Sequence, residues 1–199
     1  VGYRYYDTFG VDVSYPFGYG GSYTSFAMST KSVKADKDKV TVQVKVKNTG
    51  TVSGKEVAEV YFSAPDGELD KPYQELAGYA KTDELAPGES QILTISFDTK
   101  EMGSYDTDKA AYVMEDGDYI IRVGNSSRNT HVAAKLNVAE DTITEQYSNL
   151  MVPVTENDNI ENSDKYPTLE PMTTEGATPI TYDGEADEIA AASTIAVDF

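Results

Sequence analysis

VTVQVKVK, residues 40–47, alternates a valine with a polar side chain at every position. Successive side chains of a β-strand point to opposite faces, so one face of this segment is entirely apolar and the other entirely polar. The apolar face consists of Val40, Val42, Val44 and Val46. The tripeptide NTG at 48–50 follows with residues that favour turns. The stretch therefore predicts a β-strand with one face in a core and one in water.

Six further segments read as short strands separated by turn residues. They are residues 56–64, 73–81, 93–97, 112–114, 119–123 and 131–138, with turns at 65–67, 86–89 and 115–118. No segment has a sustained helical period, although residues 100–105 suit one short helical turn. The pattern predicts an all-β fold, a seven-stranded β-sandwich of the fibronectin type III-like (immunoglobulin-like) kind over residues 27–138.

The N-terminal segment, residues 1–26, is dense in aromatic residues and glycine. It holds nine of the 21 aromatic residues and five of the 15 glycines. So much exposed ring surface would cluster or aggregate if it stayed in water. We expect the segment to lie in a groove between other structural units, with its tyrosine hydroxyls at the edge.

The net charge of −18 is unevenly distributed. Residues 139–199 carry 14 acidic side chains and one basic one, Lys165, whereas residues 1–138 carry 20 and 15. Such a chain repels phosphate backbones and anionic lipid, which argues against nucleic acid and membrane surfaces as partners. No apolar run approaches the roughly 18–20 residues of a membrane-spanning helix, so we expect a soluble protein. Cysteine is absent, which excludes disulfides, cysteine nucleophiles and Cys-ligated zinc.

Several motifs in the same order resemble one enzyme family. They are GYRYYD, YPFGYG and SYT in residues 2–24, then VKVKNTGTVSGKEVAEVYFSAP, ELDKPYQELAGYAKTDELAPGES and YIIRVGNSSRN. Together they resemble the interdomain hinge and fibronectin type III-like domain of the C-terminal region of family 3 glycoside hydrolases, β-glucosidase-like, over about residues 1–138. One departure is Gly21, where that family usually has leucine after PFGYG.

The resemblance implies a non-catalytic part of a retaining β-glucosidase. In that family the nucleophile is an aspartate of a (β/α)8 barrel and the acid/base is a glutamate usually found in an α/β-sandwich domain. No stretch here matches either motif, so we assign no catalytic, metal-binding or cofactor-binding residue, and we expect no cofactor. The implied role is to brace those two domains, which would be the partners. A carbohydrate-binding or cell-surface adhesion module is the alternative, with carbohydrate as the partner, and hydrolysis by this chain alone is a third hypothesis.

Residues 139–199 differ from the rest in composition. Turn and breaker residues are frequent, and large apolar side chains are scattered. We expect an acidic extended connector or tail that runs across the surface of a neighbouring domain. The apolar residues expected to bind it there are Val152, Val154, Tyr166, Leu169, Ile180 and Tyr182. Only residues 185–192 have plain helix-forming composition. A connector of this length favours the family's reversed order (α/β-sandwich, type III-like domain, barrel), with an appended extra domain in the usual order as the rival.

The remaining candidates for chemistry have structural interpretations that we favour. The aromatic side chains of the N-terminal segment are expected to pack between domains rather than stack on sugars: Tyr3, Tyr5, Tyr6, Phe17, Tyr19 and Tyr23. Arg4, near Asp7, suits an ion pair or a cation–π contact. The charged loop at residues 66–73 is expected to be solvated and to help dock the sandwich, although such loops can border a neighbouring active site.

Three short motifs complete the candidates. His131 is the single histidine, which makes a catalytic triad or histidine-rich metal site implausible, and it should be a half-exposed strand residue. Asn125-Ser126-Ser127 fits the glycosylation pattern but also a strand-ending turn, which we favour. Residues 158–164 offer oxygen ligands without the calcium-loop pattern. The chain starts at Val1 without a leader segment, so we read it as a fragment, a processed chain or a domain, and both cytoplasm and export stay open.

Overall fold

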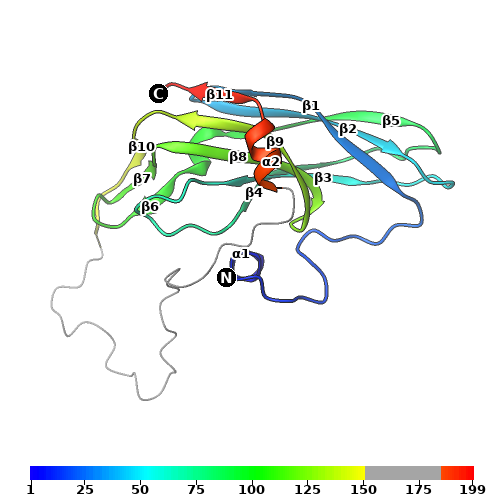
Figure 1. Cartoon of the computed structure of the whole chain (residues 1–199), viewed down its shortest axis with the longest axis horizontal. Helices are drawn as coiled ribbons and strands as arrows, with labels where there is room; N and C mark the ends of the chain where they lie inside the picture. The colour runs from blue at the N-terminus through cyan, green and yellow to red at the C-terminus, as the bar shows by residue number, and fades with distance from the viewer. Residues whose placement is uncertain (151–184) are drawn as a thin grey trace, which may run out of the picture.

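The computed structural model describes residues 1–150 and 185–199 and shows an all-β fold (Figure 1). One sheet of the sandwich has three antiparallel strands in the order β1-β2-β5. These strands are β1 (Phe26–Ala35), β2 (Lys39–Asn48) and β5 (Ser90–Asp98). The four alternating valines of β2 are completely buried, which confirms the pattern from which the strand was predicted.

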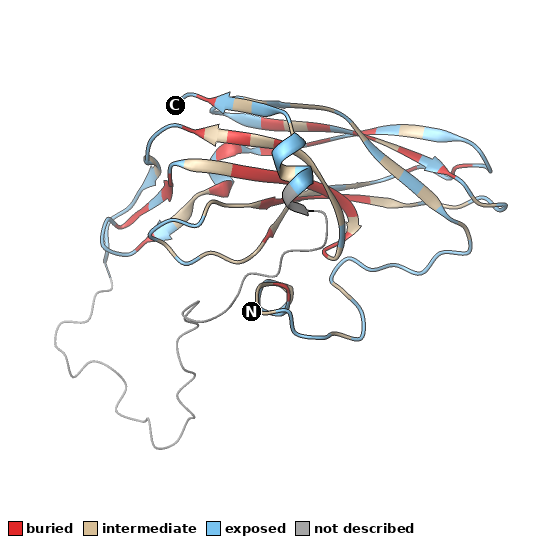
Figure 2. Ribbon diagram, viewed as in Figure 1, coloured by how far each residue is buried: buried red, intermediate tan, exposed pale blue. Residues whose placement is uncertain are grey.

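The second sheet has five strands in the order β11-β9-β8-β3-β4. Their bounds are β11 (Thr194–Val197), β9 (Asn129–Val138), β8 (Gly117–Ser126), β3 (Val57–Ser63) and β4 (Glu75–Lys81). Its inner face contributes Val60, Phe62, Ile121, Val123 and Leu136 to one core shared with β2 and β5. In Figure 2 the buried positions run along the strands of both sheets, as expected when two sheets bury their facing sides.

A small third sheet lies at one end of the sandwich, with strand order β10-β7-β6. It consists of β10 (Thr142–Gln146), β7 (Ala111–Met114) and β6 (Ser104–Asp106), and a short 3₁₀ helix, η1 (Thr99–Met102), precedes it. The 3₁₀ helix lies close to the predicted helical turn at 100–105. The buried Met102 and Met114 connect this end to the main core.

The structure corrects the predicted elements at several places, and the short strand β6 is one that the sequence pattern did not indicate. Residues 131–138 were expected to form the last strand, but β10 and β11 follow them. β1 was missed because its sequence, FAMSTKSVKA, has few large apolar residues and no sustained alternation. Helix α1 (Tyr3–Thr8) occupies the N-terminal segment, where no helix was predicted. It is too short, at six residues, to show a helical period.

The end of the acidic segment folds back on the sandwich. Helix α2 (Glu185–Ala191) agrees with the helix-forming composition of 185–192 and packs on β9. β11 then pairs parallel to β9, with Val197 opposite Val138. Val197 is buried, so a strand from the predicted connector completes the sheet. Figure 1 shows β11 and α2 against the sandwich, with the C-terminus on the side away from α1.

Parts of the predicted connector lie outside the described residues. These are the apolar positions Val152, Val154, Tyr166, Leu169, Ile180 and Tyr182 and the oxygen-rich stretch 158–164. Among the residues that are described, no helix has both the length and the apolar character needed to cross a membrane.

Candidate functional site: the docked N-terminal segment

The N-terminal segment (residues 1–26) is held against the outer face of the five-stranded sheet. The hydroxyl of Tyr3 accepts a hydrogen bond of 2.8 Å from the backbone N–H of Leu76 in β4. The hydroxyl of Thr8 accepts one of 2.8 Å from the N–H of Tyr73. Because both donors belong to the edge strand β4 or its approach, α1 satisfies backbone groups that a bare sheet edge would leave unpaired.

The turn between β8 and β9 fixes the other side of α1. The guanidinium of Arg128 donates through Nε to Asp7 Oδ1 at 2.8 Å and through Nη2 to the carbonyl of Val11 at 2.7 Å. The N–H of Ser127 donates to the carbonyl of Phe17 at 2.8 Å. Asp7 is 3% exposed, and its ion pair with Arg128 compensates the buried charge.

A buried carboxyl lies beneath this segment. Every residue from Ala58 to Phe62 is buried, so β3 is covered on its outer face as well as in the core. On that outer face Tyr61 donates a 2.7 Å hydrogen bond to Glu59, while its ring meets Tyr3 edge-on at 6.2 Å. Burial raises the pKa of Glu59, and the bond from Tyr61 opposes this effect. Burial also raises the pKa of Tyr61.

Gly18 shows how closely the segment approaches that carboxyl. Its φ is +81°, and a Cβ atom there would overlap the carboxylate of Glu59. Only glycine combines this backbone conformation with so little space. Gly21, by contrast, would place a Cβ atom in open space, so the leucine usual at that position would meet no steric obstacle at its Cβ atom.

The outer side of the segment presents aromatic rings to solvent. Tyr15 and Tyr19 stack at 5.1 Å, and Phe17 stacks on Tyr3 at 4.3 Å. The rings of Tyr5, Tyr6, Tyr15, Phe17, Tyr19 and Tyr23 are between 39% and 101% exposed. The inner groups of the segment therefore bind the sandwich, and its outer rings stay exposed. We call these exposed rings the hinge surface.

Arg4 forms the predicted ion pair, but with a different partner. Its Nη2 lies 2.8 Å from Glu75 Oε2, whereas Asp7 is bound by Arg128. Sequence reasoning chose the nearby Asp7 because separation along the chain was the only guide. The role of Arg128, 121 residues from Asp7, had no signal in the sequence.

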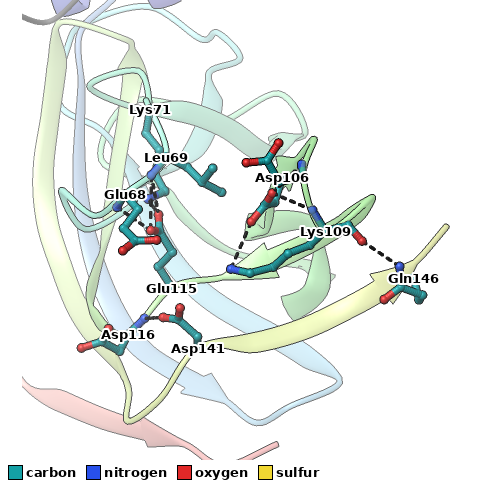
Figure 3. Close-up of polar contacts among 10 residues, drawn as sticks. Glu68, Leu69, Lys71, Asp106, Lys109, Glu115, Asp116, Asp141 and Gln146 are labelled. Carbon is teal, nitrogen blue, oxygen red and sulfur yellow. Dashed lines mark hydrogen bonds and ion pairs between the residues drawn. The ribbon is translucent and has the colours of Figure 1, made fainter. Parts of the chain in front are cut away.

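The loop at residues 66–73 is more firmly held than the solvated loop that we predicted. The buried carboxylate of Glu115 accepts hydrogen bonds from the N–H groups of Glu68, at 2.5 Å, and Leu69, at 3.3 Å. It also forms an ion pair with Lys71, and both side chains are about 5% exposed (Figure 3). The interpretation of Glu115 as part of a turn missed this role. Asp66, Glu68 and Asp70 stay exposed on the outside of the loop.

The remaining motifs have structural partners. His131 is half-buried in β9, as predicted, and its Nε2 lies 3.0 Å from Thr30 Oγ1. Burial lowers the pKa of His131, while Glu188 opposes this shift. Asn125, at the end of β8, donates to Glu56 and accepts from Asn129. Within residues 1–150 and 185–199, no three His, Cys, Asp or Glu side chains gather as metal ligands would.

Comparison with known proteins shows which proteins share this architecture. Residues 56–127 match the sequence profile of the fibronectin type III-like domain. The chain is 42% identical over 161 residues to a β-glucosidase of Ruminococcus albus, covering 78% of this chain and 17% of that protein. It is 40% identical over 176 residues to β-glucosidase A of Butyrivibrio fibrisolvens, covering 77% of this chain and 21% of that protein.

Solved structures give the same result. The crystal structure of a β-glucosidase from Paenibacillus barengoltzii superposes with a TM-score of 0.74 at 44% identity, over 78% of this chain and 18% of that one. β-Glucosidase 3B of Thermotoga neapolitana in complex with glucose gives 0.68 at 44% identity, over 73% and 20%. This chain thus spans about a fifth of the length of these relatives.

Proposed function

Because this chain is the hinge and fibronectin type III-like region of a family 3 glycoside hydrolase, we propose that it braces the catalytic domains of a retaining β-glucosidase. The type III-like domain is a non-catalytic accessory domain of such enzymes. The parent would remove terminal β-linked glucose through a covalent intermediate. Its barrel nucleophile and its α/β-sandwich acid would be held in register by contacts with this chain. Bracing matters because a 1 Å misplacement of catalytic groups can cost roughly a hundredfold in rate.

The hinge surface is the observation that carries this proposal. The inner side of the N-terminal segment is fixed to β4 and to the β8–β9 turn, which makes the segment part of the sandwich. Its outer rings stay exposed, and this chain matches only about a fifth of the length of its relatives. We infer that the neighbouring domains of the parent cover these rings.

The buried carboxyl groups support a non-catalytic role. Asp7 is bound by Arg128, Glu59 by Tyr61, and Glu115 by Lys71 and two backbone N–H groups. A retaining glycosidase needs a nucleophile and a proton donor facing one open pocket. These three groups are instead engaged in holding the N-terminal segment and the 66–73 loop, so we propose no catalytic role for any of the three.

We propose the domain division that follows from these contacts. Residues 1–26 are the interdomain hinge, 27–138 the type III-like sandwich, and 139–199 a connector that also lends β10 and β11 to the sheets. The order of the domains in the parent stays a prediction.

The experiment is to mix this chain with the separately produced catalytic domains of the same parent and measure hydrolysis of an aryl β-glucoside. The chain alone should release no product, and its addition should raise the activity of the catalytic domains. A chain with Tyr15, Phe17 and Tyr19 replaced by serine should add little, whereas Tyr79→Ser, an exposed tyrosine on β4, should behave as the unchanged chain. Product released by the chain alone, or equal activation by both variants, would refute the proposal.

A further inference from the structure

A second group of exposed aromatic rings lies on the small sheet, far along the chain from the hinge surface. Tyr105 of β6, Tyr112 of β7 and Tyr147, just after β10, are 39%, 39% and 46% exposed. We call these three residues the tyrosine face. The relatives' hinge motifs do not include them, and the contacts of the N-terminal segment described above do not involve them.

The rings of the tyrosine face are held in fixed orientations. Tyr105 and Tyr112 are directly opposite each other in the β6–β7 register, with ring centroids 5.3 Å apart at 65°. Tyr112 and Tyr147 meet at 6.0 Å and 67°. The Tyr105 hydroxyl donates to Asn149 Oδ1 at 3.0 Å. Since packing and hydrogen bonds fix the rings before a ligand arrives, binding there costs little side-chain entropy.

Charged side chains lie beside the rings of the tyrosine face. Glu145 of β10 lies opposite Tyr112 in the register, and Lys100 Nζ lies 3.9 Å from its carboxylate. A hydrogen bond with Glu145 raises the pKa of Tyr147. The centre of a protein–protein interface is usually depleted of charged residues, which makes this mixed surface a poor match to an apolar partner. It matches an amphipathic ligand that offers both C–H faces and hydroxyl groups.

The tyrosine face is remote from the hinge surface. β8 starts at Gly117, close to the small sheet, and ends at Ser126, next to the turn that binds α1. Ten residues of strand span about 30 Å. Figure 1 shows β6, β7 and β10 together at the left of the sandwich, with α1 below its middle. A domain docked on the hinge rings would therefore leave room for a ligand at the other end.

We propose that the tyrosine face is an accessory site for a short chain of β-linked glucose units. Glucose with equatorial hydroxyls presents apolar C–H groups on both ring faces, which stack on the π-face of tyrosine. Glu145, Lys100 and the amide of Asn149 lie at the edge, where the sugar hydroxyls would be. The sugar's identity rests on the proposed function, while the presence of a carbohydrate site rests on the rings and their polar neighbours.

The test is to titrate this chain with cellotetraose and with laminaritetraose. Isothermal titration calorimetry measures the affinity, and NMR measures which backbone amide chemical shifts change. Shifts should be confined to β6, β7 and β10. Tyr112→Ala and Tyr147→Ala should each weaken binding about tenfold, the loss of one stacked ring. The control Tyr79→Ala removes a tyrosine of β4 that is even more exposed, at 70%, and should leave affinity unchanged.

The outcomes separate this site from the bracing role. Tyr147 lies outside the strands, so we expect Tyr147→Ala to fold. This variant still tests the site if Tyr112→Ala does not fold. Absence of shifts with both sugars, shifts centred on the hinge rings, or equal affinity in all variants would each overturn the proposal. Protection of the tyrosine face by the parent's catalytic domains would also overturn it, in favour of a docking surface. Failure of the activation assay with intact sugar binding would refute the bracing role alone.

Discussion

Asp7 in helix α1 and Arg128 in the β8–β9 turn are joined by a hydrogen bond of 2.8 Å, although 121 residues separate them in the sequence. The carboxylate of Asp7 is buried, while the side chain of Arg128 is 24% exposed. This pair connects the aromatic N-terminal segment to the turn between two interior strands of the five-stranded sheet. It makes that segment a built part of the domain rather than a free linker.

Replacing Arg128 should release the N-terminal segment. Arg128→Ala leaves the buried charge of Asp7 without a partner and removes the bond to the Val11 carbonyl. We expect a loss of about 3 kcal/mol in the free energy of opening this segment. Hydrogen exchange of the amides in residues 1–26 measures it. The matched control is Arg4→Ala, whose pair with Glu75 is half exposed and should contribute less than about 1 kcal/mol. Equal losses in the two variants would contradict this assignment.

The ion pair under the 66–73 loop should be essential for the order of that loop. Lys71→Ala leaves Glu115 buried and unpaired, and we expect a loss of about 3 kcal/mol in the free energy of unfolding. Adding Glu115→Gln should recover part of it, because the amide needs no counter-charge. Lys109→Ala breaks the neighbouring, more exposed pair with Asp106 in Figure 3 and should cost less than about 1 kcal/mol. Urea denaturation gives all three values, and no recovery in the double variant would argue against a buried charge pair.

Glu59 should make stability depend on pH. Burial raises its pKa above the ordinary 4.5, so the folded protein holds this proton more tightly than the unfolded chain does. Stability is then lost as pH rises from about 4.5 through the raised pKa. Glu59→Gln removes that loss and still accepts the hydrogen bond from Tyr61. Its unfolding free energy, relative to the unchanged chain, should improve between about pH 4 and pH 8. The exposed Glu84→Gln serves as control, and a pH-independent difference for Glu59→Gln would count against the mechanism.

β11 should contribute to the stability of the sandwich. Val197 is 2% exposed and packs in the main core, whereas its neighbour Ala196 faces solvent. Val197→Asp places an unpaired charge in the core and should cost about 3 kcal/mol or more in the free energy of unfolding. Ala196→Asp, on the same strand, should change it by less than about 0.5 kcal/mol. Urea denaturation of the two variants compares them, and similar midpoints would mean that β11 does not hold the sheet.

Local patterns predicted much of the sandwich. The alternation in residues 40–47 specified both the strand and its buried face, because a period of two is a property of the strand itself. Turn residues at 65–67 and 86–89 placed the end of β3 and the start of β5 in the same way. Residues 115–118 predicted a hairpin between the strands beside them, but β8 already begins at Gly117 and pairs with β9 and β3, whereas β7 belongs to the small sheet. The aromatic density of residues 1–26 predicted a segment that lies between structural units. The structure shows one side of it docked on the sandwich, and burial of the outer rings by other domains stays a prediction. The density did not indicate helix α1.

The sequence by itself determined the all-β class, the core face of β2, the family resemblance and the place of helix α2. The tertiary structure alone decided which distant groups meet: Asp7 with Arg128, Lys71 with Glu115, and β11 beside β9 in parallel. These contacts have no period and no short spacing, since each depends on how the whole chain brings two remote segments together. Burial then stabilises these contacts, because a charge or a backbone polar group that is removed from water needs a partner inside the protein.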